Sequence, residues 1–341
     1  MHFQDLLNTL QDQQDLPDEG LAGLLSCKDP QVLEDLHARA RRVAQERFGK
    51  EVYLRGLVEW SNVCRNDCLY CGIRRSNSSI GRYSLSRDQI LDCTQALYDK
   101  GIRTVVLQGG ENPAGALQLV GVVKEIRRRW PEIAITLSLG ELPFDTYAAL
   151  RHAGADRYLL RHETADAGHY ACLHPEGMSL QKRQDCLTEL RRLGFQTGMG
   201  MMTGSPYQTV SHLVADIRLI QSFRPEMIGI GPFVPQKDTP LGGFPAGDPT
   251  LTLKLYSLLR LMLPDALIPS TTALATVLPE GCIKGILAGA NVIMPNFTPA
   301  PVRAEYELYN QKSHQGLETI IKDLASIGYA ASASRGDYCK H

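Results

Sequence analysis

Short apolar or β-branched segments alternate with longer amphipathic stretches along most of the chain. Such repetition is typical of a parallel sheet with helices packed outside it. The expected strands are Val52–Glu59, Thr104–Gln108, Ala134–Ser138, Arg157–Arg161, Gln196–Met201, Met227–Gly231, Leu267–Ser270 and Asn291–Met294. About eight regularly spaced βα units predict an α/β fold that closes into one complete (β/α)8 barrel of the TIM type.

The segments between the expected strands carry ordinary helix signals. Leu119, Val122, Val123 and Ile126 recur at helical spacing and form one apolar stripe. Ser86 with Gln89 forms a capping-box pattern that predicts where another helix begins.

The expected barrel occupies residues 51–300 and leaves a segment at each end. Residues 1–50 predict an N-terminal helical extension that covers the bottom of the barrel. Residues 301–341 predict a short closing helical segment followed by a polar tail.

The composition narrows the kind of partner. Lysine and arginine total 36 against 37 acidic residues, and no long basic block occurs, so nucleic acid is not an expected partner. No apolar run reaches the roughly 18 residues of a membrane span, and the first residues lack a secretory signal. Nine cysteines, an odd number mostly far apart, suit a reducing compartment. We therefore expect a cytoplasmic protein that acts on a small molecule.

Three cysteines, Cys64, Cys68 and Cys71, lie within eight residues directly after the first expected strand. Three thiolates hold a [4Fe-4S] cluster while leaving one iron free for another ligand. A zinc site would need a fourth ligand, but no histidine occurs between His37 and His152. Active sites of such barrels lie at the carboxyl ends of the strands, where this loop is expected. The triplet predicts an iron–sulfur cluster.

Polar groups follow other expected strands. Gly109 and Gly110 allow close approach of the backbone to a ligand and expose carbonyl groups to an ammonium, beside Glu111. Strand alternation places Arg157, Arg161 and Glu163 on one face. If that face is the interior, the charges need each other or a zwitterionic or anionic ligand. A purely structural ion network is the alternative.

Single side chains at the expected mouth of the barrel carry weaker signals. Ser138 ends the third strand, and Thr271 and Thr272 follow the seventh. Tyr70 precedes the last cysteine of the triplet, where it either shields the cluster, touches a cofactor, or packs.

Several segments resemble the HydE family of radical S-adenosylmethionine (SAM) enzymes, the maturases of FeFe-hydrogenase, over residues 50–310. They are Ser61–Cys64 through Cys71–Arg75, Thr136–Glu141, Ala155–Thr164, Gly229–Phe233 and Ala290–Asn296. The resemblance implies that SAM binds the open iron and the Gly109–Glu111 segment. It places Ser138, Glu163 and Arg183 at SAM, and implies an inner cavity lined by Arg157, Arg161, Thr271, Thr272 and Tyr306.

The resemblance also implies a reaction. SAM is cleaved reductively to methionine and a 5'-deoxyadenosyl radical, which acts on an iron-bound cysteine complex with CO and cyanide ligands. The product leads to the diiron dithiolate subcluster of the hydrogenase H-cluster. Implied partners are the sister maturases HydG and HydF and an electron donor such as ferredoxin or flavodoxin. Residues 309–316 lack cysteine, so no auxiliary cluster is expected.

Two other functions compete with this interpretation. A mutase like 3-methylornithine synthase shares the barrel and the triplet, and product analysis with lysine would separate it. An iron–sulfur carrier or scaffold explains the triplet but not eight βα units with a charged interior. A relative of biotin synthase would need further grouped cysteines, which this chain lacks.

Overall fold

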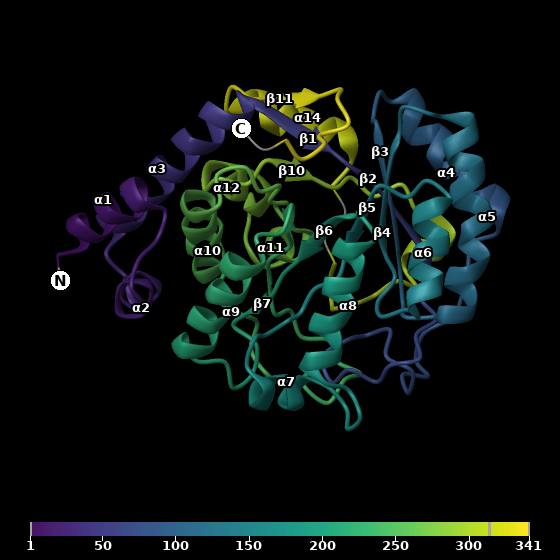
Figure 1. Cartoon of the computed structure of the whole chain (residues 1–341), viewed down its shortest axis with the longest axis horizontal. Coiled ribbons are helices and arrows are strands. Elements are labelled where there is room, and N and C mark those ends of the chain that lie inside the picture. Colours follow the sequence, from purple (N-terminus) through teal and green to yellow (C-terminus); the bar gives the residue numbers. More distant parts are fainter. Residues whose placement is uncertain (1, 313–314, 340–341) are drawn as a thin grey trace.

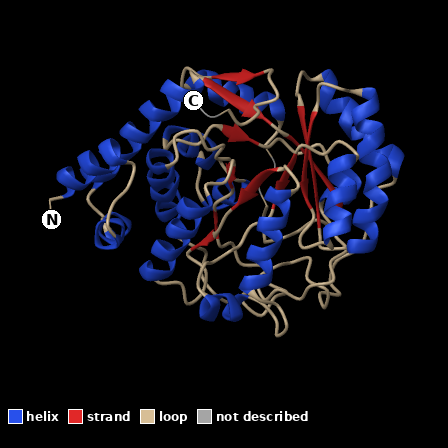
Figure 2. Cartoon of the chain, in the orientation of Figure 1, coloured by secondary structure: helices blue, strands red, loops and turns tan. Residues whose placement is uncertain are grey.

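A ring of parallel strands inside a ring of helices forms the centre of the molecule (Figure 1, Figure 2). The computed structural model describes residues 2–312 and 315–339. Six neighbouring strands share one parallel sheet in the order β2, β3, β4, β5, β6, β8. Their bounds are Gly56–Ser61, Thr104–Gly109, Ala134–Ser138, Arg157–Leu159, Gln196–Met199 and Met227–Ile228.

Isolated parallel bridges close the ring. Met227 of β8 pairs with Leu267, and Pro269 pairs with Val292 of β10 (Val292–Ile293). Leu57 of β2 then pairs with Asn296, beyond the end of β10. Two short strands, β7 (Met202–Thr203) and β9 (Gly231–Pro232), pair beyond β6 and β8. The predicted (β/α)8 barrel is confirmed, although its seventh strand, the segment 267–270, pairs with its neighbours only through single bridges.

Helices surround the ring and pack against it. They are α4 (Arg87–Asp99), α5 (Pro113–Arg129), α6 (Phe144–His152), α7 (Ala167–Leu173), α8 (Leu180–Arg192), α9 (Val210–Phe223), α10 (Pro249–Met262), α11 (Thr272–Val277) and α12 (Gly281–Leu287). The predicted stripe of α5 is buried, and Ser86 and Gln89 form the predicted capping box of α4. No helix in the described ranges is long and apolar enough to cross a membrane.

The N-terminal helices α1 (Phe3–Gln13), α2 (Asp18–Ser26) and α3 (Pro30–Phe48) cover the side of the barrel and not its bottom. They pack against α9 and α10, at the left of Figure 1. Helix α10 is buried on nearly all sides, so its outer face needs a second layer. The Lys254 ammonium of α10 donates a 2.8 Å hydrogen bond to the Leu25 carbonyl, which ties the layers together. The expected position of residues 1–50 is corrected accordingly.

The last part of the C-terminal segment covers the amino ends of the strands instead. Helices α13 (Ala300–Arg303) and α14 (Leu317–Ser326) lead to β11 (Ala330–Ser332). Strand β11 pairs in parallel with β1 (Glu51–Leu54), which also pairs with β10. Of the expected 301–341 segment, residues 313–314 and 340–341 lie outside the described residues. In Figure 1, β1 and β11 lie at the opposite end from α7.

Arg157 joins this floor to the ring. Its side chain is fully buried and donates to the Asp337 carboxylate at 2.6 Å and the Arg335 carbonyl at 2.9 Å. It also donates to Thr104 Oγ1 at 3.2 Å and Gln196 Oε1 at 3.1 Å. Thr104 and Gln196 begin β3 and β6, so Arg157 lies at the amino ends of the strands. The tail is thereby fastened beneath the barrel.

Replacing Arg157 with methionine is expected to destabilise the fold by about 3 kcal/mol, because Asp337 and the polar ends of neighbouring strands lose their buried partner. Urea unfolding measures the change as a lower midpoint. Arg128→Met is the matched control, since the Arg128 side chain is 70% exposed and should change stability by less than about 0.5 kcal/mol. Equal midpoints for the two variants would show that the floor contact contributes nothing.

Candidate active site

A cavity of about 300 Å³ lies at the carboxyl ends of the strands. Its size and its mixture of apolar and charged walls suit a small-molecule site. Nearly all of the predicted site residues line it: Cys64, Cys68, Cys71, Tyr70, Gly109, Gly110, Glu111, Ser138, Arg161, Glu163, Arg183, Thr271, Thr272 and Tyr306. Arg157 does not, because the barrel floor holds it at the other end of β5. Its expected place in the inner cavity is corrected.

The three cysteines of the triplet border the same cavity on the loop after β2. Burial and the two neighbouring thiols raise the pKa of Cys68 well above its ordinary value, and burial raises the pKa of Cys71 to about 12. Among residues with described positions, no three His, Cys, Asp or Glu side chains meet closely enough for a single metal ion. The three cysteines line one cavity, which fits a cluster whose cysteines each bind a different iron.

The loop that carries the cysteines is held by its own polar residues. Asp67 accepts a 2.7 Å hydrogen bond from Arg74, and this contact lowers the pKa of the Asp67 carboxyl. The Arg82 guanidinium donates to the carbonyls of Asn62 at 2.7 Å and Ile73 at 2.8 Å. These donors satisfy backbone carbonyls that a loop outside regular structure leaves unpaired. Sequence reasoning missed Arg82, because its partners are backbone atoms.

Gly110 lets the backbone beyond β3 pack closely against this loop, and Gly109 lets β3 pack closely against Trp60 of β2. A methyl group on Gly110 would lie 2.5 Å from the Val63 carbonyl oxygen and 2.8 Å from Cys64 Cβ. One on Gly109 would lie 2.3 Å from Trp60 Nε1. The close approach anticipated for a ligand is thus also an approach of backbone to the cysteine loop.

Replacing Gly110 with alanine is therefore expected to displace Cys64 and reduce the iron bound after anaerobic reconstitution by at least half. The added methyl group cannot fit unless the loop moves. Iron counting and the absorbance of the cluster measure the loss. Gly121→Ala is the control, because a methyl group at Gly121 meets no atom within 4 Å. Full iron content in G110A would contradict this account of the loop.

Glu111 connects the cysteine loop to the next strand. Its carboxylate accepts from Arg65 Nε at 2.8 Å and from the Glu141 backbone N–H at 2.7 Å. The Glu111 backbone N–H donates to Cys64 Sγ at 3.3 Å. Glu141 in turn lies 2.9 Å from Arg183 Nε. This network fixes the wall beside the cysteines.

Arg161 and Glu163 form a second ion pair at the end of β5. The Arg161 guanidinium donates to Glu163 Oε2 at 2.8 Å and to the Met201 carbonyl at 3.0 Å. Glu163 has a φ of 67°, a left-handed conformation that is uncommon for this residue type and often marks functional sites. The buried Nε of Arg161 has no hydrogen-bond partner among the described residues. Both side chains of the pair line the cavity, so a ligand bound there can contact them.

Of the remaining predicted site residues, Tyr70 and Thr271 also have structural contacts. Tyr70 is edge-on to His174 with 5.6 Å between ring centroids, so packing accounts for part of its surface. Thr271 caps α11 by accepting from the Leu274 backbone N–H at 3.4 Å, and its hydroxyl also lies 3.3 Å from the Tyr256 hydroxyl. Ser138 and Thr272 border the cavity from the ends of β4 and the start of α11.

Residues 304–312, here called the strap, cross the mouth of the barrel. The Leu308 carbonyl accepts from the Gly72 backbone N–H at 2.9 Å, within the cysteine loop. At the other side, the Asn310 backbone N–H donates to the Pro235 carbonyl at 3.1 Å. Tyr306, Tyr309 and Lys312 of the strap line the cavity. The strap therefore forms part of the roof.

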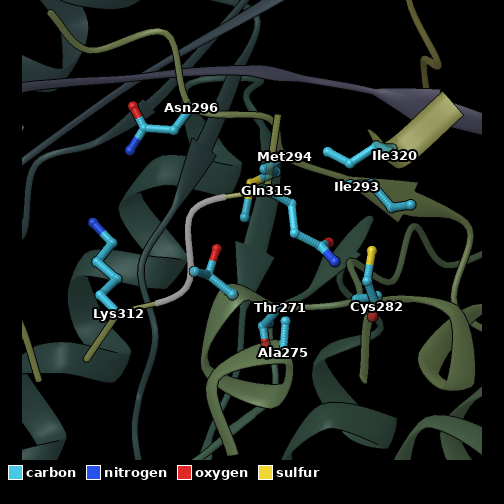
Figure 3. Close-up of a pocket in the computed structure, with 11 residues that line it drawn as sticks. Thr271, Ala275, Cys282, Ile293, Met294, Asn296, Lys312, Gln315 and Ile320 are labelled. Carbon is cyan, nitrogen blue, oxygen red and sulfur yellow. The ribbon is translucent and has the colours of Figure 1, made fainter. Parts of the chain in front are cut away.

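Two charged cavity residues escaped the sequence analysis. Glu59 of β2 is fully buried and is paired with Lys312 of the strap. A glutamate inside an apolar strand was the available signal, since buried carboxylates need a partner. Lys312 also borders a side cavity of about 30 Å³, roughly the space of one water molecule (Figure 3).

Comparison with known proteins agrees with this geometry. Residues 58–220 match the radical SAM superfamily. The [FeFe] hydrogenase maturase subunit HydE of Thermotoga maritima is 44% identical over 295 residues, which cover 86% of this chain and 84% of that protein. The 3-methylornithine synthase of Methanosarcina acetivorans is 29% identical over 319 residues, which cover 92% and 89%.

Solved structures agree on the fold. The crystal structure of methylornithine synthase has a TM-score of 0.86 and 27% identity, covering 96% of this chain and 97% of that one. The maturase HydG from Carboxydothermus hydrogenoformans, at 21% identity, has a TM-score of 0.82 and covers 99% of this chain and 80% of that one. With the barrel, the triplet and the extent of the HydE match together, this chain belongs to the radical SAM superfamily and, within it, to the HydE family of hydrogenase maturases.

Proposed function

We propose that this radical SAM enzyme uses a 5'-deoxyadenosyl radical to modify an iron-bound cysteine complex with CO and cyanide ligands, in the maturation of the FeFe-hydrogenase H-cluster. The observation that carries the proposal is one cavity bordered by three clustered thiols at one wall and by ion pairs at others. The 44% identity to a HydE maturase supports the same role.

Cys64, Cys68 and Cys71 are the proposed ligands of a [4Fe-4S] cluster. When bound, the cluster supplies the electron that cleaves SAM into methionine and a 5'-deoxyadenosyl radical. The raised pKa values of these buried thiols mean that metal binding must displace their protons. Arg82 and Asp67 keep the loop in shape for that ligand set.

SAM is proposed to bind beside the cysteines, with Ser138, Glu163 and Arg183 facing its polar groups. A carboxylate at Glu163 suits an ammonium, and the Arg183 guanidinium suits a carboxylate. Burial lowers the pKa of Arg183, but Tyr170, Glu141 and Glu111 together raise it above its ordinary value, so the guanidinium stays charged. The carbonyls of Gly109 and Gly110, which also line the cavity, are available to the SAM ammonium.

The second ligand is proposed to occupy the part of the cavity bordered by Arg161, Thr271, Thr272 and Tyr306. The strap and the apolar residues Leu57, Ile73 and Leu159 exclude water from this space. Exclusion of water protects a reactive intermediate from side reactions. The protein's part in the reaction is to bind and orient the two ligands and to keep water out of the cavity.

The proposed partners are the sister maturases HydG and HydF and a reducing protein such as ferredoxin or flavodoxin. Arg65 and Arg75 are exposed on the cysteine loop, where they suit an acidic electron donor. A thiol-ligated cluster also needs a reducing compartment, which supports a cytoplasmic location.

The test is an anaerobic SAM-cleavage assay with reconstituted protein and dithionite. We expect 5'-deoxyadenosine, formed at least about tenfold faster with the iron–cysteine complex than with L-lysine, since only the fitting ligand places a reacting atom against the radical. A methylornithine synthase structure with a TM-score of 0.86 makes a lysine mutase the second candidate. Conversion of L-lysine to a rearranged amino acid would overturn the maturation proposal. A SAM-cleaving protein that responds to neither ligand would also overturn it.

A further inference from the structure

The Glu59 carboxylate occupies a wall of the cavity without contact with solvent. Asn296 Nδ2 donates to Glu59 Oε2 at 3.0 Å, and Thr298 Oγ1 lies 3.5 Å from the same oxygen. The other oxygen accepts from the Lys312 ammonium. Burial of a carboxylate is costly unless a cation lies beside it. Glu59 is therefore built to hold a positive charge beside it.

Lys312 supplies that positive charge, and it belongs to the strap, which follows the last strand of the barrel. Its side chain is 6% exposed and lies over the Tyr306 ring, with the ammonium 4.9 Å from the ring centroid. Besides Glu59, its described acceptor is the Tyr306 carbonyl at 3.4 Å. An ammonium has three N–H donors, so the described contacts leave one for a ligand. Burial lowers the pKa of Lys312, and the Glu59 carboxylate opposes that shift.

The two arginines that line the cavity, Arg161 and Arg183, are paired with other carboxylates. Arg183 is paired with Glu141 at the wall where SAM is proposed to bind. Arg161, which borders the part proposed for the second ligand, is already paired with Glu163. Lys312 borders the place where the cavity meets the side cavity, together with Thr271 and Thr272. In Figure 3 its side chain extends toward Asn296. The chain thus places one ammonium by the Tyr306 ring, in the part of the cavity proposed for the second ligand.

We infer that Lys312, positioned by Glu59, is a specificity-determining residue that binds a carboxylate group of the second ligand. This inference rests on the proposed function and deepens it, because it assigns the amino-acid moiety of the ligand to a particular side chain. Glu59 is a positioning residue, since its carboxylate acts through the lysine. Thr271 and Thr272 line the same cavity.

The test compares two ligands that differ by one carboxylate. SAM-loaded holoenzyme is titrated with the iron–cysteine complex and with the same complex made from cysteamine. Wild type should bind the cysteine complex more tightly. Lys312→Met should weaken binding of the cysteine complex by about 10- to 100-fold and leave the cysteamine complex unchanged, as expected for a charge-assisted hydrogen bond. Lys312→Arg should restore part of the discrimination.

Three controls separate this role from a structural one. Lys322→Met removes an exposed lysine of α14 and should leave both affinities unchanged. The double variant Glu59→Gln with Lys312→Met avoids an unpaired buried carboxylate and should lose discrimination while folding normally. The change that SAM produces in the electron paramagnetic resonance spectrum of the reduced cluster should persist in every variant.

The outcomes for the two proposals are distinct. Equal losses for both complexes, or no loss for either, overturn the role of Lys312 while leaving maturation standing. If wild type ignores the iron complexes, the same variants are titrated with L-lysine and cadaverine. If Lys312→Met no longer binds L-lysine more tightly than cadaverine, Lys312 binds a carboxylate but the maturation substrate is wrong. If Lys312→Met keeps the preference of the wild type for L-lysine, both proposals are overturned.

Discussion

We expect the replacement of Cys68 by serine to abolish SAM cleavage. Serine keeps the shape of the side chain but is a poor ligand for iron, and two thiolates remain where three are needed. Loss of an outer hydrogen-bond partner of a metal ligand already costs roughly 10- to 100-fold in affinity or activity. Loss of the ligand itself should exceed that, with 5'-deoxyadenosine formation at least about 100-fold lower.

Iron counting and the low-temperature spectrum of the reduced protein check this result independently of turnover. Cys172→Ser is the matched control, because Cys172 is an exposed cysteine on α7 and does not line the cavity. It should retain its iron and its activity. A C68S protein with four irons and normal SAM cleavage would remove the triplet from the mechanism.

Replacement of Arg183 by leucine should both destabilise the protein and weaken SAM binding. Glu141 is buried, and loss of its cationic partner leaves an uncompensated charge at a cost of about 3–5 kcal/mol. Urea unfolding measures the first effect, and titration with SAM measures the second, expected to exceed tenfold. Lys182→Leu tests the neighbouring residue, whose side chain is 63% exposed and lies 3.7 Å from Glu141, so it should cost at most about 1 kcal/mol.

The double variant Arg183→Leu with Glu141→Leu divides the two effects. It should recover most of the lost stability, because no buried charge stays unpaired. SAM affinity should remain low, since the guanidinium is still absent. Recovery of SAM affinity in the double variant would mean that Arg183 serves only to neutralise Glu141.

Much of the barrel follows from the sequence because buried parallel strands leave a clear pattern. The expected strand Ala134–Ser138 coincides with β4, and Thr104–Gln108 falls one residue short of β3. The first expected strand proved to be two, since β1 belongs to the floor sheet and β2 to the ring. The Leu267–Ser270 segment forms only single bridges, a detail that depends on neighbouring staves.

The residues that line the cavity were predictable where one segment supplies several of them. The cysteine triplet and the two glycines are local patterns, and both reach the cavity. The alternation from Arg157 to Glu163 was extended too far, because β5 ends at Leu159 and Glu163 adopts a left-handed conformation. The Arg157 position was wrong because the periodicity of a strand gives the face of a residue and not its depth in a barrel. Lys312 had no local signal, since its partner lies far away in sequence.

The strap is made from a late part of the polypeptide, and this sets an order of events during synthesis. Residues 304–312 leave the ribosome after every stave of the ring, and they then cross the cysteine loop at Gly72. Until they arrive, the cysteine loop lacks the strap above it. The cysteine loop is therefore made before the segment that covers it.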